Sequence, residues 1–139
     1  METQPTQTPA RPTNDVIRLP NGLLGFESVK NYILLANPEE APFMWFQMLD
    51  EGKRSFLVVV PSIVMPDYQP VFGDSDIQFL KLTDPADAFL LCIVTLKPHD
   101  PPTVNLKGPI VINRRTLIGK QVIPTNANGY SLKHPLAVS

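Results

Sequence analysis

Ala88-Phe89-Leu90-Leu91-Cys92-Ile93-Val94-Thr95 is a continuous apolar run whose last three residues are β-branched. An apolar run of this length between turn signals is typical of a strand that is buried on both faces. We therefore expect residues 89–96 to form the central strand of the fold. Cys92 is the chain's single cysteine, and we expect it to pack inside this strand as a small hydrophobic residue. The sequence therefore has no disulfide framework and no cysteine-based metal site.

Proline interrupts the chain on both sides of this run. Sixteen of the 139 residues are proline, and the longest proline-free windows are 43–60 and 21–37. A helix rarely continues through a proline, and neither window carries apolar residues at a sustained helical spacing. These features exclude a helical bundle, and the hydrophobic fraction of 43% excludes disorder throughout. The chain is predicted to be all-β, with about eight to ten short strands in an antiparallel barrel or sandwich.

Apolar runs between polar breaks predict the positions of the other strands. We expect them over 15–19, 32–36, 43–49, 56–60, 76–82, 103–106, 109–113 and 120–123, with a further short candidate around 130–132. Turns or loops are expected to connect them at Asn21-Gly22, 50–53, 97–102 and 114–119. A turn or a single helical turn is expected at 83–87, with Asp84 as its cap and Pro85 at its first position.

The length of the chain suits one domain. Residues 1–14 are rich in Thr, Gln and Pro, and we expect them to form a disordered tail ahead of a folded domain over 15–136. The N-terminus has neither the basic nor the apolar segment of a signal peptide. No apolar run reaches the roughly 18 residues that span a bilayer. We therefore expect a cytoplasmic protein that does not contact the membrane.

The balance of charge disfavours a protein whose main task is to bind a phosphate backbone. Twelve basic and thirteen acidic residues give a formal net charge of −1. The charges are unevenly distributed, because residues 38–87 hold nine acidic and three basic residues, whereas 88–139 hold one acidic and six basic residues. The middle of the chain is therefore a candidate surface for a basic partner. The alternative is that these charges lie on solvated loops and are interspersed in the fold.

Motifs of catalysis and of phosphate binding are absent from the sequence. His99 and His134 each lie beside a proline in an expected loop, where a surface position is more usual than a metal pair. Asp67, Asp74 and Asp76 are candidates for a metal or acid–base cluster, but the pattern at 74–76 lacks the downstream Glu of a calcium loop, which favours solvated turn carboxylates. We expect no enzyme, no cofactor and no metal site.

Three segments resemble a known family in their order and spacing. They are Leu23-Leu24-Gly25-Phe26-Glu27, Asp67-Tyr68 after the strand at 56–60, and the block from Thr103 to Asn113 with Gly119-Lys120-Gln121-Val122-Ile123 behind it. Together they resemble the FliW family of flagellar assembly factors over residues 15–136. The resemblance implies a compact, mostly antiparallel β-barrel-like fold and a cytoplasmic location.

The resemblance also implies two protein partners for a monomeric, non-catalytic protein. Members of the family bind flagellin in the manner of a chaperone, and they bind CsrA, a small basic RNA-binding repressor of flagellin translation. Flagellin that accumulates would occupy the protein and leave CsrA free to repress. Once flagellin is exported, the protein would capture CsrA and relieve repression. An alternative function is that of a small β-barrel that binds nucleic acid, and a hydrolase on a β scaffold is a further alternative.

Two sets of residues are candidates for contact with these partners. Acidic residues of 38–87 are expected to bind CsrA, and three are favoured because we expect them in loops: Asp67, Asp74 and Asp76. The second set lies between proline-rich breaks, which are expected to leave the backbone of a sheet edge unpaired: Thr103, Val104, Asn105, Leu106 and Lys107. Asn105 has the alternative role of bonding a neighbouring turn, and Ile110 and Ile112 are expected in the core.

Overall fold

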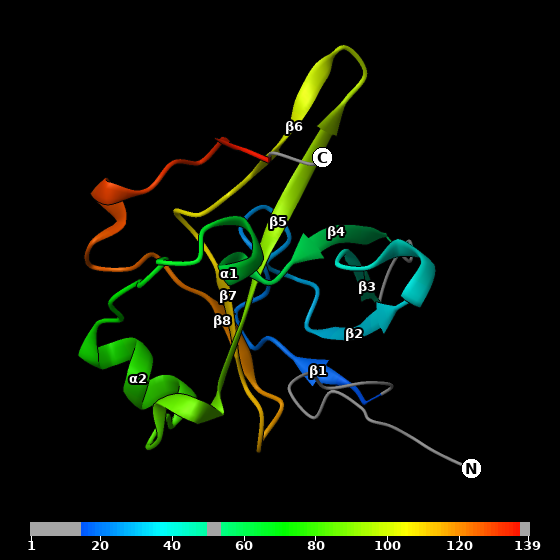
Figure 1. Ribbon diagram of the computed structural model, residues 1–139. Helices are drawn as coiled ribbons and strands as arrows, with labels where there is room; N and C mark the ends of the chain where they lie inside the picture. Colours follow the sequence, from blue (N-terminus) through cyan, green and yellow to red (C-terminus); the bar gives the residue numbers. More distant parts are fainter. Residues whose placement is uncertain (1–14, 50–53, 137–139) are drawn as a thin grey trace.

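The computed structural model describes residues 15–49 and 54–136 and has a mostly antiparallel β architecture (Figure 1). The expected tail at 1–14 and the expected turn at 50–53 lie outside the described residues. The strands are β1 (Ile17–Arg18), β2 (Asn31–Ala36), β3 (Met44–Met48), β4 (Ser55–Val59), β5 (Ala88–Lys97), β6 (Asp100–Val104), β7 (Ile110–Asn113), β8 (Gly119–Gln121) and β9 (His134–Pro135). The helices are α1 (Pro61–Val64) and α2 (Asp74–Leu80), with 3-10 turns η1 (Pro38–Glu40), η2 (Pro85–Asp87) and η3 (Ala127–Gly129).

The long strand β5 organises the sheet, as the apolar run predicts. Its middle pairs with β4, its first half with β7 and its second half with β6. Residues 88–94 are buried or half-buried, whereas 95–97 are exposed. The expected burial on both faces is therefore wrong for the end of the strand. The physical reason is that β5 and β6 extend beyond the rest of the sheet as a hairpin (Figure 1).

The remaining strands curve into a barrel-like arrangement. Antiparallel pairing runs from β1 through β2, β3 and β4 to β5, and continues from β5 to β7 and β8. The two ends are not joined by a full strand ladder among the described residues. They are brought together by a bridge between Arg18 and Ile118, with the Arg18 amide donating to the carbonyl of Leu117 at 2.9 Å. The fold is thus all-β and barrel-like, as expected.

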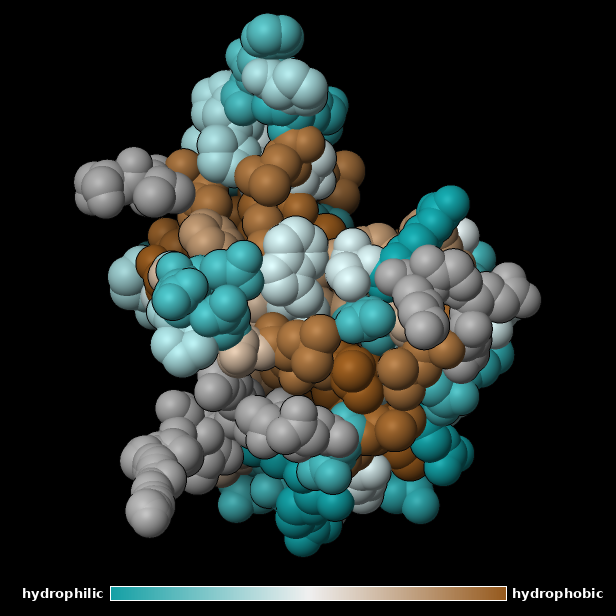
Figure 2. Space-filling model, turned by 90° about the vertical axis from the view of Figure 1, so that its right-hand side faces the viewer, coloured by the Kyte–Doolittle hydropathy of each residue, from teal (hydrophilic) through white to brown (hydrophobic). Residues whose placement is uncertain are grey.

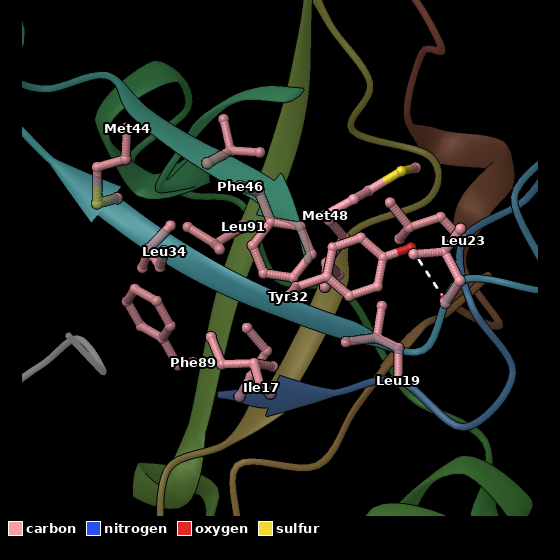
Figure 3. Close-up of a cluster of buried hydrophobic side chains, with 14 residues drawn as sticks. Ile17, Leu19, Leu23, Tyr32, Leu34, Met44, Phe46, Met48, Phe89 and Leu91 are labelled. Carbon is pink, nitrogen blue, oxygen red and sulfur yellow. Dashed lines mark hydrogen bonds between the residues drawn. The ribbon is translucent and has the colours of Figure 1, made fainter. Parts of the chain in front are cut away.

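The barrel core fills the inside of this arrangement (Figure 3). Tyr32 and Phe46 stack at its centre with ring centroids 4.7 Å apart, and the Tyr32 hydroxyl donates to the carbonyl of Val29 at 3.2 Å. Ile110 and Ile112 are fully buried in the same core, which confirms their prediction. Because alternate residues of β5 point inward, the core receives Phe89 and Leu91, with Ile93 packed at its margin.

Two smaller apolar clusters lie outside the barrel core. The outer cluster packs against the opposite face of β5 and β6, with six buried members: Val59, Tyr68, Cys92, Val94, Val104 and Leu106. The burial of Cys92 confirms its expected packing. The helix cluster joins Leu80 of α2 to Val111 and Val122.

Several local predictions are wrong and one is confirmed in detail. The strand expected at 76–82 is helix α2, the loop expected at 97–102 is largely the β5–β6 hairpin, and β9 forms at 134–135 instead of 130–132. Polar and proline-rich segments carry no apolar alternation, which explains why β9 and the first residues of β6, ahead of the strand expected at 103–106, are not predicted. The expected helical turn is η2, in which the Asp84 side chain accepts from the Ala86 amide at 3.0 Å.

Candidate partner-binding surfaces

The segment 23–27 forms a tight loop that presents Leu24 to solvent. Gly22 and Gly25 adopt φ values of +66° and +89°, which glycine tolerates far better than other residues. The Glu27 side chain closes the loop by accepting a hydrogen bond from the Gly25 amide at 3.0 Å. That backbone N–H lowers the pKa of Glu27. Leu24 is 64% exposed, while its amide donates to the Gln121 side chain at 3.0 Å.

The block 103–107 alternates between the surface and the core. Val104 and Leu106 are fully buried in the outer cluster, whereas Thr103, Asn105 and Lys107 are half-buried. The Asn105 carboxamide oxygen accepts from the amides of Lys107 and Gly108, both at 3.0 Å. Asn105 therefore shapes the turn between β6 and β7, which is the alternative role considered for it.

The backbone edge expected to be unpaired at 103–106 is covered, so that expectation is wrong. Strand β9 pairs with β6 through Thr103↔Pro135 and Val104↔His134. The Leu106 amide donates to the carbonyl of Ser131 at 3.0 Å, and the Asn105 amide donates to β5. The physical reason is that the C-terminal segment folds back along the hairpin and uses the hydrogen-bonding groups that proline leaves open.

The two motif segments, far apart in the sequence, line one groove of about 510 Å³. We call it the mouth groove, because the inward face of β5 continues into it beyond the barrel core. Leu24 and Phe26 enter it from the 23–27 loop, Thr103 from β6, Asn105 from the turn after β6, and Gln121 from β8. The Gln121 side chain connects these elements, since it accepts from Leu24 and donates to the carbonyl of Gly108 at 3.0 Å.

One face of the molecule carries exposed apolar surface below the β5–β6 hairpin (Figure 2). On the side shown in Figure 2, apolar side chains gather below the polar tip of the β5–β6 hairpin. Leu132 was not among the sequence candidates, yet it lines the groove and is 57% exposed. The sequence marks this position only as part of the short strand candidate at 130–132, and an isolated leucine among polar residues carries no signal of a binding surface.

The three candidate aspartates occupy different environments. Asp67 is exposed in the turn after α1, and its neighbour Tyr68 donates to the Leu106 carbonyl at 2.7 Å. Asp74 is exposed in the first turn of α2, whereas Asp76 forms an ion pair with Lys120 of β8. The expectation that Asp74 and Asp76 lie in loops is therefore wrong. A group of three or more metal-ligating side chains is not found within 15–49 and 54–136.

The remaining titratable candidates of the sequence are two histidines and one cysteine. His99 is exposed at the tip of the hairpin, and His134 is half-buried in β9. Cys92 is fully buried, and this burial raises the pKa of its thiol to about 12. A thiol in that state is a poor nucleophile. Across the described residues, none of the helices is long and apolar enough to span a membrane.

Comparisons with known proteins agree on one family. The family model described as FliW protein matches residues 1–136. The flagellar assembly factor FliW of Leptospira biflexa is 36% identical over 131 residues, which cover 92% of this chain and 85% of the relative. The factor of Syntrophus aciditrophicus is 39% identical over 111 residues, covering 79% and 70%. A crystal structure of the flagellar assembly factor FliW superposes with a TM-score of 0.80 at 36% identity, covering 90% of this chain and 87% of the other.

Proposed function

This chain belongs to the FliW family of flagellar assembly factors, and we propose that it acts by binding two proteins, flagellin and the regulator CsrA. Flagellin would occupy it while export is slow. After export it would capture CsrA and relieve repression of flagellin translation. It acts in the cytoplasm as a monomer, without catalysis. Such a switch needs only that the two partners disfavour each other on one protein.

One observation carries this proposal, namely that separate segments of the family motif converge on an open groove. Leu24, Asn105 and Gln121 come from three different elements and meet there around exposed apolar surface. A concave surface with exposed apolar side chains and a few polar groups is typical of a protein-binding site. This supports binding of a polypeptide over chemistry on a small substrate.

The CsrA part of the proposal rests on exposed acidic side chains. Asp67 and Asp74 remain exposed and belong to the segment with a net charge of −6. Asp76 is a weaker candidate than the sequence suggests, because Lys120 already neutralises it. Complementary charge would raise the association rate of a basic partner and make its binding sensitive to salt.

Isothermal titration calorimetry with purified CsrA and with purified flagellin monomer tests the proposal. The unaltered protein should bind each partner, and flagellin should lower the affinity for CsrA. Asp67→Lys should weaken CsrA binding by roughly tenfold and reduce its salt dependence, because it replaces attraction with repulsion. Asp15→Lys is the matched control, since Asp15 is exposed and lies outside the acidic segment. Equal affinities and equal salt slopes for the two variants would contradict the role of Asp67.

A further inference from the structure

The mouth groove is built as a continuation of the barrel interior. Ile93, Thr95 and Lys97 share one face of β5 because alternate residues of a strand point the same way. Ile93 packs at the margin of the barrel core, and the next two residues on that face line the groove. The strand register pairs Thr95 of β5 with Thr103 of β6. The β5–β6 hairpin therefore forms a continuous floor of the groove.

Apolar side chains give the groove its affinity for a polypeptide. Phe26 and Phe56 meet edge to face within it, with ring centroids 5.3 Å apart. Leu24 and Leu132 line the same groove at 64% and 57% exposure. A single exposed leucine is ordinary, but two that adjoin an aromatic pair in one concavity form a contiguous apolar surface. An apolar side chain from a partner would bury this surface.

The charges of the groove indicate what else the occupant carries. Lys97 and Lys133 both line it, and Asp100 is the single acidic side chain in its lining. Within the described part of the chain, neither lysine ammonium takes part in a hydrogen bond or an ion pair. The lining therefore has a net positive charge, opposite to that of segment 38–87. A carboxylate would complement it, and a basic ligand would be repelled.

We propose that the mouth groove binds an acidic, apolar segment of flagellin. An apolar side chain of that segment packs on Leu24, Leu132 and the aromatic pair, and a carboxylate lies near Lys97 and Lys133. The side-chain nitrogen of Asn105, Nδ2, makes no hydrogen bond within the described residues and is available to a backbone carbonyl of the segment. This inference rests on the proposed function. It assigns the groove to flagellin, because a basic partner such as CsrA has the wrong charge.

A pair of leucine variants tests the apolar part. Leu24 and Leu96 are 64% and 63% exposed, but Leu96 does not line the groove. Leu24→Asp should weaken binding of purified flagellin monomer by at least tenfold, on the order expected of a central interface residue, whereas Leu96→Asp should leave it unchanged. Both side chains are exposed, so thermal unfolding should be the same for the two variants. Equal flagellin affinities for them would overturn the assignment of the groove.

Two variants with altered charge test the sign of the charge on the bound segment. The double variant Lys97→Glu with Lys133→Glu should weaken flagellin binding and reduce its salt dependence, and Asp100→Lys should strengthen it. The reverse pattern, in which Asp100→Lys weakens and the glutamates strengthen, would overturn the acidic character of the segment. If the unaltered protein does not bind flagellin at all, the proposed function itself fails. If the unaltered protein binds flagellin and all groove variants bind it with the same affinity, only this inference fails.

Discussion

Asn105 and Asn113 perform the same local task at the ends of two consecutive strands. Each carboxamide oxygen accepts backbone N–H groups two and three residues ahead, which fixes a turn. Asn113 is fully buried and also donates to the carbonyl groups of Leu80 and Lys81, at 2.8 and 3.3 Å. It thereby joins the end of β7 to the end of α2. The asparagines of this motif therefore have a structural role before any role in binding.

The buried thiol of Cys92 makes the fold less stable as the pH rises into the alkaline range. Burial raises the pKa of its thiol to about 12, above the roughly 8.5 of an unfolded chain. Below the unfolded value both states are neutral and the full stability is present. As the pH rises above the pKa of the unfolded state, the thiol ionises in the unfolded state first. Stability therefore falls until the pH reaches the pKa of the folded state.

The free energy of unfolding should therefore fall by about 1–2 kcal/mol between pH 8 and pH 10. Burial also raises the pKa of Tyr68, whose contribution begins at higher pH. Urea unfolding in the presence of a reductant, at several pH values, measures the slope. Cys92→Ala is expected to lower stability at every pH but to remove this part of the slope. Parallel pH profiles for the two proteins would contradict the prediction.

Helix α2 shows why short helices are missed in a proline-rich β chain. Ile77 and Phe79 suggest the alternation of a strand, and seven residues are too few to establish a helical period. The helix ends at Lys81 with a φ of 55°, a left-handed conformation in which glycine is the usual signal. Tertiary contacts stabilise the helix, because Leu80 packs in the helix cluster and Asp76 forms an ion pair with Lys120. Such contacts cannot be derived from local sequence.

Leu80 should therefore be the residue on which the docking of α2 depends. It is 2% exposed and packs on Val111 and Val122, so Leu80→Ala should lower the free energy of unfolding by about 2–4 kcal/mol. Gln78→Ala, at an exposed position of the same helix, should change it by less than about 0.5 kcal/mol. Urea unfolding followed by circular dichroism compares the two. A loss below about 1 kcal/mol for Leu80→Ala would show that α2 contributes little to the fold.

Over the whole molecule, the sequence predicts strands better than it predicts how they meet. The central position of β5, the apolar β2, β3 and β4 and the hairpin of β7 and β8 follow from local patterns. The contact between Arg18 and Leu117 that brings the barrel ends together does not, because no local pattern links strands so far apart in the chain. The mouth groove likewise combines segments far apart in the chain, namely the 23–27 loop, β6 and β8. The residues of the mouth groove can therefore be predicted only in part. The sequence identifies the motifs that line the groove, but it does not show that these motifs lie next to one another.

The two proposed partner surfaces lie on opposite faces of the β5–β6 hairpin. Thr95 and Thr103 line the mouth groove, whereas Val94 and Val104 point to the outer cluster with Tyr68, next to Asp67. If flagellin and CsrA use these faces, they do not compete for the same atoms. Their antagonism then requires either coupling through the hairpin or a clash between the two bound proteins, and in both cases each partner changes the other's affinity by the same factor.

Different substitutions should therefore weaken the binding of flagellin and the binding of CsrA. Leu24→Asp should weaken flagellin binding by at least about tenfold and leave CsrA binding unchanged in the absence of flagellin. Asp67→Lys should have the opposite selectivity. Calorimetric titration of each variant with each partner, at one ionic strength, gives the four affinities. A variant that weakens both partners equally while its thermal stability is unchanged would place them on one shared surface, and the switch would then be simple competition.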